Sequence, residues 1–293
     1  MFLLGALAAL PLSMLSEIPE EMVACSQGAV VRIQARSYEQ GDILLVRLIE
    51  PSPVREVKVS FLDREFVLKP KSEGGEPQAL IGLDLSLRPG RYFMDMALTL
   101  DESGPETVRK IILVKPGKFR SKRLTLPPKY VTPPPEEMDR IKRESELLAE
   151  VYKKASDRWL AEGFFVLPNE ARMDFNFGER RVLNGRTSSV HSGVDIDADM
   201  GSTIIASNSG KVVLAADIYF SGNTVILDHG LGVFTSYLHM SKLLVKTGDL
   251  VRKGDVIGEV GSTGRSTGPH LHWSVRVFDS RVDPRSLIRL RLN

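Results

Sequence analysis

The sequence predicts a mainly β protein built from two domains, and three observations lead to this prediction. Apolar and polar residues alternate with a period of two over much of the chain, as in strands with one buried face. Glycine and proline separate these short runs. A proline-rich stretch followed by one helical pattern divides the 293 residues into two parts, each of ordinary domain size.

The composition is that of a globular protein with little net charge. Hydrophobic residues make up 42% of the chain and charged residues 26%, and the net charge at pH 7 is +2. Such a balance implies no broad basic surface, so we expect no nucleic-acid partner. Segment 118–129 is a local exception, with five basic residues and no acidic one. It is either a solvated linker or a segment attracted to an anionic polymer such as a cell wall.

Residues 1–20 are predicted to be a signal or anchor segment. Residues 2–15 carry no charge and are mostly apolar. This run is shorter than the ~20 residues of a membrane-spanning helix and suits the core of a signal peptide. A lipid-modified Cys25, the single cysteine of the chain, is the alternative. We therefore expect export to the periplasm or cell envelope.

Residues 21–115 are predicted to form an immunoglobulin-like β domain. Strand patterns occupy 31–35, 43–49, 57–61, 91–100 and 107–114. Short strands at this spacing, separated by turn signals, are typical of a β-sandwich. The region contains no histidine, so we expect a spacer, docking or inhibitory module that tunes access to the chemistry elsewhere. Its partner would be an envelope protein, and the chain itself is expected to be a monomer.

Residues 116–163 are predicted to be a proline-rich linker followed by a helix. Six prolines between positions 116 and 135 indicate a stiff connector rather than a packed element. Thr132 is the expected helix cap, and Gly163 marks the expected end. Apolar residues recur at helical spacing at Ile141, Leu148, Tyr152, Ala155 and Trp159. This stripe packs either on a domain or on a coiled-coil partner.

Residues 164–293 are predicted to form a second all-β domain, and it carries all five histidines. Its strand patterns occupy 203–207, 211–217, 223–228, 232–238, 255–260 and 271–277. Histidine is the commonest metal ligand and the usual general base near neutral pH. The chemistry is therefore expected in this domain.

Two pairs of side chains have the spacing of metal ligands. His191 and Asp195 are four residues apart, and His270 and His272 are two apart. In extended segments both spacings place the paired side chains on one face, because side chains repeat every two residues. A catalytic zinc site uses three protein ligands and keeps a fourth position open. These residues, with His239, offer enough ligands for such a site.

The motifs around these histidines resemble those of the lysostaphin-type (LytM-like) zinc endopeptidases, which cut the peptides of peptidoglycan. The resemblance covers about residues 164–287. It rests on FGERR (177–181), NG (184–185), HSGVDI (191–196), GSTIIA (201–206), GNTV (222–225), DHG (228–230), YLH (237–239) and GSTGRSTGPHLH (261–272). It implies an open antiparallel β-sheet domain with Zn²⁺ in a groove.

The resemblance also implies the roles of the site residues. His191, Asp195 and His272 would be the zinc ligands, and His239 and His270 the catalytic residues. The chain has no His-Glu-x-x-His motif, so an imidazole must replace the glutamate base of other zinc proteases. We assign His270 as the base toward a zinc-activated water and His239 to the tetrahedral oxyanion. The sequence leaves these two roles exchangeable.

The predicted function is hydrolysis of the peptide cross-links of bacterial peptidoglycan. Family members cut either glycine bridges or bonds between D-alanine and a diamino acid, and the sequence does not distinguish these substrates. One alternative is a non-catalytic regulator, which would have lost a ligand. Another is a lipoyl or biotinyl carrier, which residues 245–260 resemble. Lys211, the nearest candidate for the carrier lysine, begins a strand instead of occupying a hairpin tip.

Five further residues near the motifs have two interpretations each. His229 is expected to make a structural hydrogen bond rather than to act in catalysis. Asp197 and Asp199 either orient a ligand or are exposed loop acids. Arg180 and Arg181 either contact an acidic peptide or form salt bridges within the fold.

Overall fold

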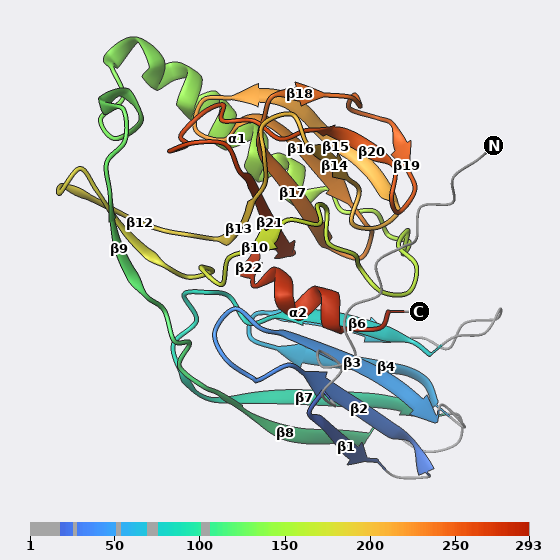
Figure 1. Cartoon of the computed structure of the whole chain (residues 1–293). Helices are drawn as coiled ribbons and strands as arrows, with labels where there is room; N and C mark the ends of the chain where they lie inside the picture. Colours follow the sequence, from blue (N-terminus) through green and yellow to red (C-terminus); the bar gives the residue numbers. More distant parts are fainter. Residues whose placement is uncertain (1–17, 26–27, 51–53, 69–75, 101–105, 293) are drawn as a thin grey trace, which may run out of the picture.

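The computed structural model describes residues 18–25, 28–50, 54–68, 76–100 and 106–292. The predicted signal or anchor segment therefore lies outside the described residues, apart from its last three positions. Among the described helices, none is both long and apolar enough to cross a membrane. The chain forms an N-terminal β-sandwich and a larger C-terminal β domain, with a connector along one side (Figure 1).

Two antiparallel four-stranded sheets form the N-terminal sandwich, in the orders β1-β2-β3-β6 and β5-β4-β7-β8. The strands are β1 (Glu20–Ala24), β2 (Val30–Ala35), β3 (Ile43–Glu50), β4 (Val54–Phe61), β5 (Arg64–Leu68), β6 (Gln78–Gly82), β7 (Gly90–Leu100) and β8 (Glu106–Val114). The alternation seen in the sequence is realised in β4, where Val57, Val59 and Phe61 are buried and Lys58 and Ser60 are exposed. The mainly β character predicted for this region is confirmed, and its likeness to an immunoglobulin domain stays a prediction.

The connector is more closely packed than the prolines predicted. β9 (Ser121–Leu124) pairs in parallel with β11 (Arg180–Leu183). Leu126 is buried, and its N–H and carbonyl both bond the Asn184 side chain, at 2.9 and 3.0 Å. The prediction of an unpacked linker was wrong here, because the extended backbone between the prolines can join the edge of a sheet and satisfy its polar groups.

The helix α1 (Met138–Lys153) is shorter than predicted. It begins after a 3-10 turn at Pro135–Glu137, and Thr132 does not cap it. It ends well before Gly163, because Ser156 instead donates its N–H and hydroxyl to Asp228 Oδ2, at 2.8 and 2.6 Å. The apolar stripe packs on the C-terminal domain through Leu148, Val151, Tyr152 and Ala155, which touch a cluster of Leu214, Ile218, Ile226 and Phe234.

A long antiparallel sheet forms the centre of the C-terminal domain, in the order β10-β13-β21-β17-β16-β15-β19, with β22 added to β21. Smaller sheets are β12-β11-β9 and β14-β20-β18. The elements are β10 (Arg172–Met173), β12 (Thr187–Val190), β13 (Gly193–Asp197), β14 (Thr203–Ile205), β15 (Gly210–Ile218), β16 (Gly222–Asp228), β17 (Val233–Met240), β18 (Lys242–Leu243), β19 (Leu250–Val251), β20 (Val256–Glu259), β21 (Leu271–Val277), β22 (Ser280–Val282) and α2 (Pro284–Arg289). This is the predicted open sheet.

The two domains share part of one hydrophobic core. Along β3, Leu44 and Val46 face the sandwich core, whereas Ile43 and Leu45 belong to the core of the C-terminal domain. The helix α2 lies between the domains in Figure 1. Polar contacts add to this interface: Arg281 donates to both carboxylate oxygens of Asp84, with its Nη2 2.8 Å from Oδ1. The sandwich therefore packs tightly against the C-terminal domain.

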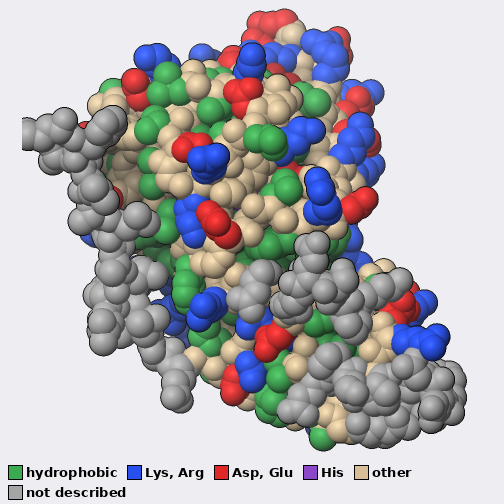
Figure 2. Space-filling view, turned by 90° about the vertical axis from the view of Figure 1, so that its right-hand side faces the viewer, with side chains coloured by type: hydrophobic (Ala, Val, Ile, Leu, Met, Phe, Trp, Pro, Cys, Tyr) green, Lys and Arg blue, Asp and Glu red, His purple; other side chains and the backbone are tan. Residues whose placement is uncertain are grey.

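The outer surface carries mixed charges. In Figure 2, lysine, arginine, aspartate and glutamate side chains are interspersed on the face shown, and no histidine appears among the coloured atoms. This mixture agrees with the small net charge of +2. Four of the five histidines, all except His229, line a groove of the C-terminal domain.

The shared core predicts an effect that independent domains would not show. Leu45 is 1% exposed, so truncation to alanine should lower the free energy of unfolding by about 2–5 kcal/mol, as for a buried core leucine. Leu44→Ala, inside the sandwich core, is the matched control with the same expected cost. Denaturant unfolding of the full chain measures both. A near-neutral Leu45→Ala would show that the domains separate in solution.

Candidate metal centre and active site

Strand pairing brings the acidic and basic side chains of the two main motifs together. In the β13–β21 pair, Asp195 stands directly opposite His272. Gly193, two residues earlier on the same strand, allows the close approach. A Cβ there would lie 2.5 Å from the Trp273 carbonyl oxygen and 2.7 Å from His272 Nε2. Any residue other than glycine would therefore push β21 and its histidine away.

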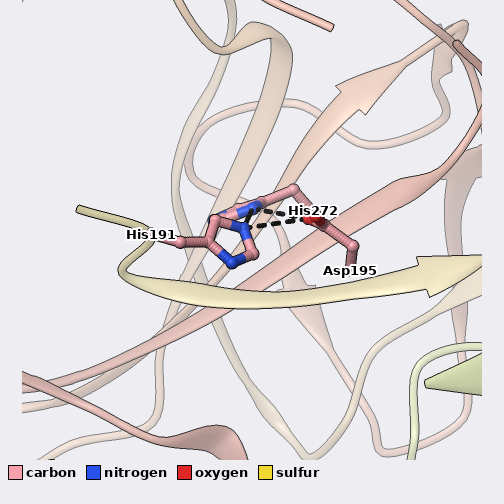
Figure 3. A group of neighbouring side chains, drawn as sticks. All are labelled: His191, Asp195 and His272. Atoms are coloured by element: carbon pink, nitrogen blue, oxygen red, sulfur yellow. Dashed lines mark hydrogen bonds and ion pairs between the residues drawn. The ribbon is translucent and has the colours of Figure 1, made fainter. Parts of the chain in front are cut away.

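Three potential ligand atoms converge at this point (Figure 3). Asp195 Oδ1 lies 3.0 Å from His191 Nε2 and 3.0 Å from His272 Nδ1. The two histidine nitrogens are 2.8 Å apart. His191 comes from the loop before β13, and both rings are less than a tenth exposed. The structure thus groups the three residues that the sequence motifs single out as ligands.

Asn176 and Arg181 hold the Asp195 carboxylate from its other side. Asp195 Oδ2 accepts hydrogen bonds from Asn176 Nδ2 at 2.9 Å and from Arg181 Nη2 at 2.7 Å. Asn176 also accepts from the Asp195 N–H, and its carbonyl accepts from His191 Nδ1 at 3.0 Å. Burial acts to raise the pKa of Asp195, but the bonds with His191 and His272 outweigh it and hold that pKa well below its usual value. Asp195 is therefore a fixed carboxylate.

The donor set fits a divalent metal such as zinc. In its neutral form, a His191 ring that donates from Nδ1 to the Asn176 carbonyl keeps a lone pair on Nε2, which lies 3.0 Å from Asp195 Oδ1. Burial lowers the pKa of His272 to about 4, so this ring is neutral and can be a ligand. Ligand atoms around one tetrahedral zinc lie roughly 3.3 Å apart, close to the separations found here. A bound cation would relieve the crowding of these electron-rich atoms.

His239 and His270 lie beside this group. Their ring centroids are 5.0 Å apart, and His239 is 6.0 Å from the His272 ring. His270 Nε2 is 3.6 Å from Asp195 Oδ1. Each ring donates a hydrogen bond from Nδ1 to a backbone carbonyl oxygen at 2.8 Å. His239 donates to Thr263, and His270 donates to Gly268. In its neutral form each ring therefore offers an unprotonated Nε2.

Comparison with known proteins agrees with these features. Residues 189–284 match the model of peptidase family M23. This part of the chain belongs to that family. The match confirms the lysostaphin-type resemblance drawn from the motifs.

Two named relatives match part of the chain. The peptidoglycan DD-endopeptidases ShyC and ShyA of Vibrio cholerae are 36% and 43% identical to it, over 46% and 39% of its length. These matches span only 32% and 26% of the two relatives' own lengths. A crystal structure of a putative peptidase M23 from Pseudomonas aeruginosa is similar over 85% of this chain and 93% of its own, with 28% identity and a TM-score of 0.63. That similarity extends beyond the M23 domain.

A groove of about 610 Å³ runs past the site. Its lining includes the three potential ligands and the two neighbouring histidines, His239 and His270. Its floor is the face of β16, β17 and β21 that carries Thr224, Ser236 and Ser274. Its opposite wall comes from the connector and from α1, including Leu126 and Tyr152. The segment that the sequence assigned to a linker therefore helps to shape the groove of the M23 domain.

The structure separates the other residues singled out in the sequence. Asp197 and Asp199 are exposed, away from the ligand atoms. Arg180 is exposed, whereas Arg181 forms the internal salt bridge with Asp195. His229 is fully buried and donates from Nδ1 to the Ser209 carbonyl at 2.7 Å, as expected of a structural histidine.

Asn176 and Arg265 are groove or site residues that the sequence analysis did not assign. Asn176 has no motif of its own beyond its position next to Phe177-Gly178, and asparagine alone does not indicate a metal site. Arg265 lies inside the GSTGRSTGPHLH motif and lines the groove. Its position between two site histidines was the signal available.

Buried His229 predicts a pH dependence of folding stability. Burial lowers its pKa to about 4, against about 6.5 in the unfolded chain. Between these two pH values, His229 is protonated in the unfolded chain but not in the folded one. Its contribution to the free energy of unfolding is therefore fully present above about pH 6.5 and falls by on the order of 3 kcal/mol toward about pH 4. His229→Asn, which can still donate to Ser209, should be less stable at pH 7 with a shallower pH slope. Unfolding curves for metal-free protein test this, and parallel slopes would contradict it.

Proposed function

We propose that this protein is an exported zinc endopeptidase that hydrolyses the peptide cross-links of bacterial peptidoglycan in the cell envelope. The observation that carries the proposal is the convergence of His191 Nε2, Asp195 Oδ1 and His272 Nδ1 beside His239 and His270. Family membership and the named DD-endopeptidase relatives support the substrate class. Export follows from the substrate's location and from the apolar residues 2–15.

Zinc would be held by His191, Asp195 and His272, two neutral imidazoles and one carboxylate. This is the common composition of catalytic zinc sites, which keep a further position for water or substrate. When bound, the metal supplies a Lewis acid that polarises the scissile carbonyl and lowers the pKa of the attacking water. Asn176 and Arg181 would keep the carboxylate oriented, because they occupy the oxygen that faces away from the ligand group.

The chain's own histidines would carry the protons of the reaction. Hydrolysis of a peptide bond transfers two protons from one water molecule to the leaving amine. His270 Nε2 is the nearer to the ligand atoms, at 3.6 Å from Asp195 Oδ1, and we assign it the first proton. His239 Nε2 takes the second, and both protons pass to the amine nitrogen. Two imidazoles with unprotonated Nε2 atoms match this requirement.

The hydrogen bond of His239 changes the role given to it above. A ring that donates from Nδ1 to the Thr263 carbonyl has no proton on Nε2 while it is neutral. A neutral His239 cannot donate to an oxyanion, so a proton-accepting role replaces that assignment in our proposal.

The metal content is the first test. We expect one zinc per chain in protein purified from zinc-containing medium, complete loss of peptidoglycan cleavage after chelation, and recovery when zinc is restored. Elemental analysis of the protein and mass spectrometry of digested peptidoglycan measure the two quantities. A protein that cuts peptidoglycan while free of metal would refute the proposed chemistry.

Single histidine variants separate ligands from proton carriers. His272→Ala should lose both zinc and activity. His270→Ala and His239→Ala should keep zinc while the rate falls by ~10²-fold or more, as expected when a general base is removed. Zinc content and cleavage rate are measured on the same samples, with circular dichroism as the folding control. A His270→Ala protein without zinc beside a His272→Ala protein that retains it would reverse our assignment.

A further inference from the structure

The groove beside the proposed active site carries excess positive charge. Its charged lining residues are Lys122, Arg181, Arg265 and Arg276 on the basic side and Glu144 and Asp195 on the acidic side. Both acids are already engaged, Asp195 by the ligand group and Glu144 by Arg140 at 2.7 Å. Arg181 is neutralised by its contacts with Asp195 and Glu179. The remaining cations have no acid to balance them within the groove.

Arg265 is a groove cation on a loop whose neighbouring residues contact both proposed proton carriers. Two residues before it, the Thr263 carbonyl accepts the hydrogen bond that orients His239. One residue after it, Ser266 Oγ lies 3.3 Å from His270 Nδ1. The Arg265 backbone N–H is fixed to the Phe220 carbonyl at 2.7 Å. Arg265 therefore stands on a loop that contacts both of the proposed proton-carrying histidines.

The Arg265 guanidinium lacks a partner within the described part of the chain. No ion pair or side-chain hydrogen bond joins it to the described residues, and it rests over the Phe220 ring, 5.0 Å from the centroid. Burial, and then the charge of Arg181, lower its pKa from the usual value, although an arginine remains charged. A half-buried guanidinium stacked on an aromatic ring presents its planar fork toward the groove. Such a fork matches a carboxylate in a bidentate arrangement.

We infer that Arg265 recognises a free carboxylate next to the scissile bond of the substrate peptide. This inference rests on the proposed function and specifies its substrate class. Where the diamino acid has two carboxyl groups, a cross-link from D-alanine leaves a free carboxylate on the carbon that bears the cross-linked amine. A glycine bridge has no charge in that position and would leave the Arg265 guanidinium desolvated and unpaired, which is costly. The groove therefore selects anionic D-alanyl cross-links over glycine bridges.

The test compares three substrates with the zinc-loaded full chain. Two are peptide dimers cross-linked from D-alanine to a diamino acid, one with the free carboxylate and one with that carboxylate converted to the carboxamide. The third is a pentaglycine peptide. We expect kcat/KM for the carboxylate dimer to exceed that for the carboxamide dimer by about 10- to 100-fold, as for loss of a charge-assisted hydrogen bond. Pentaglycine should be cut more slowly still.

Substitution of the arginine should remove this preference. Arg265→Gln should lower kcat/KM on the carboxylate dimer by about 10- to 100-fold, mainly through KM, and change it by no more than about 2-fold on the carboxamide dimer. Arg265→Lys should retain part of the preference, because it keeps the charge but loses the fork. Arg252→Gln, an exposed cation outside the groove lining, is the matched control and should leave both substrates unaffected. Zinc content should be unchanged in all three variants.

The outcomes separate this inference from the proposed function. Wild-type protein that cuts both dimers or pentaglycine equally well overturns the carboxylate inference and leaves the endopeptidase intact. Equal losses on both dimers in Arg265→Gln, or loss of its zinc, also overturn the inference by showing a structural role. Zinc-loaded wild-type protein that cuts none of the three substrates refutes the proposed function itself. If Arg265→Gln fails to fold, the wild-type preference and Arg265→Lys still decide.

Discussion

The pairing of β13 with β21 is the constraint on which the rest of the site depends. In an antiparallel pair, directly opposed side chains on one face lie within reach of each other, and here Asp195 is opposed to His272. A shift of this register by one residue would turn the side chains of the shifted strand to the other face of the sheet and separate the pair. The small Gly193 permits the close approach that this register needs. The metal site is thus set by backbone pairing and then refined by side chains.

Backbone carbonyls complete the orientation of the histidines. His191, His239 and His270 each direct Nδ1 to a carbonyl oxygen, so in the neutral ring Nε2 carries no proton. In all three rings, a backbone carbonyl, which does not titrate, therefore favours the neutral tautomer with its proton on Nδ1. The same device serves the proposed ligand His191 and the two proposed proton carriers. What distinguishes their roles is position relative to Asp195 rather than ring chemistry.

The strands of both domains were predictable because each has one face buried. In β21, for example, the predicted 271–277 coincides with the observed Leu271–Val277. The residues grouped at the site were also predictable, since His-x-His and His-x-x-x-Asp spacings place side chains on one face of extended chain. The end of α1 was not, because it depends on Asp228, about 70 residues away in sequence, capturing Ser156. Asn176 was hidden for the same reason: its importance comes from contacts across the fold with Asp195 and His191.

The proline-rich connector and the helix after it become part of the groove wall only through contacts with distant parts of the chain. Strand β9 of the connector extends the small sheet of β11 and β12, and α1 then packs on the cluster containing Phe234. The hydroxyl groups of Tyr152 in α1 and Ser236 are 3.0 Å apart. The Arg276 guanidinium lies over the Tyr152 ring, 4.4 Å from the ring centroid. The helix is therefore attached to the groove floor at a few points while none of its residues is fully buried. This wall bounds the groove, so a part of the chain without histidines helps to shape the space in front of them.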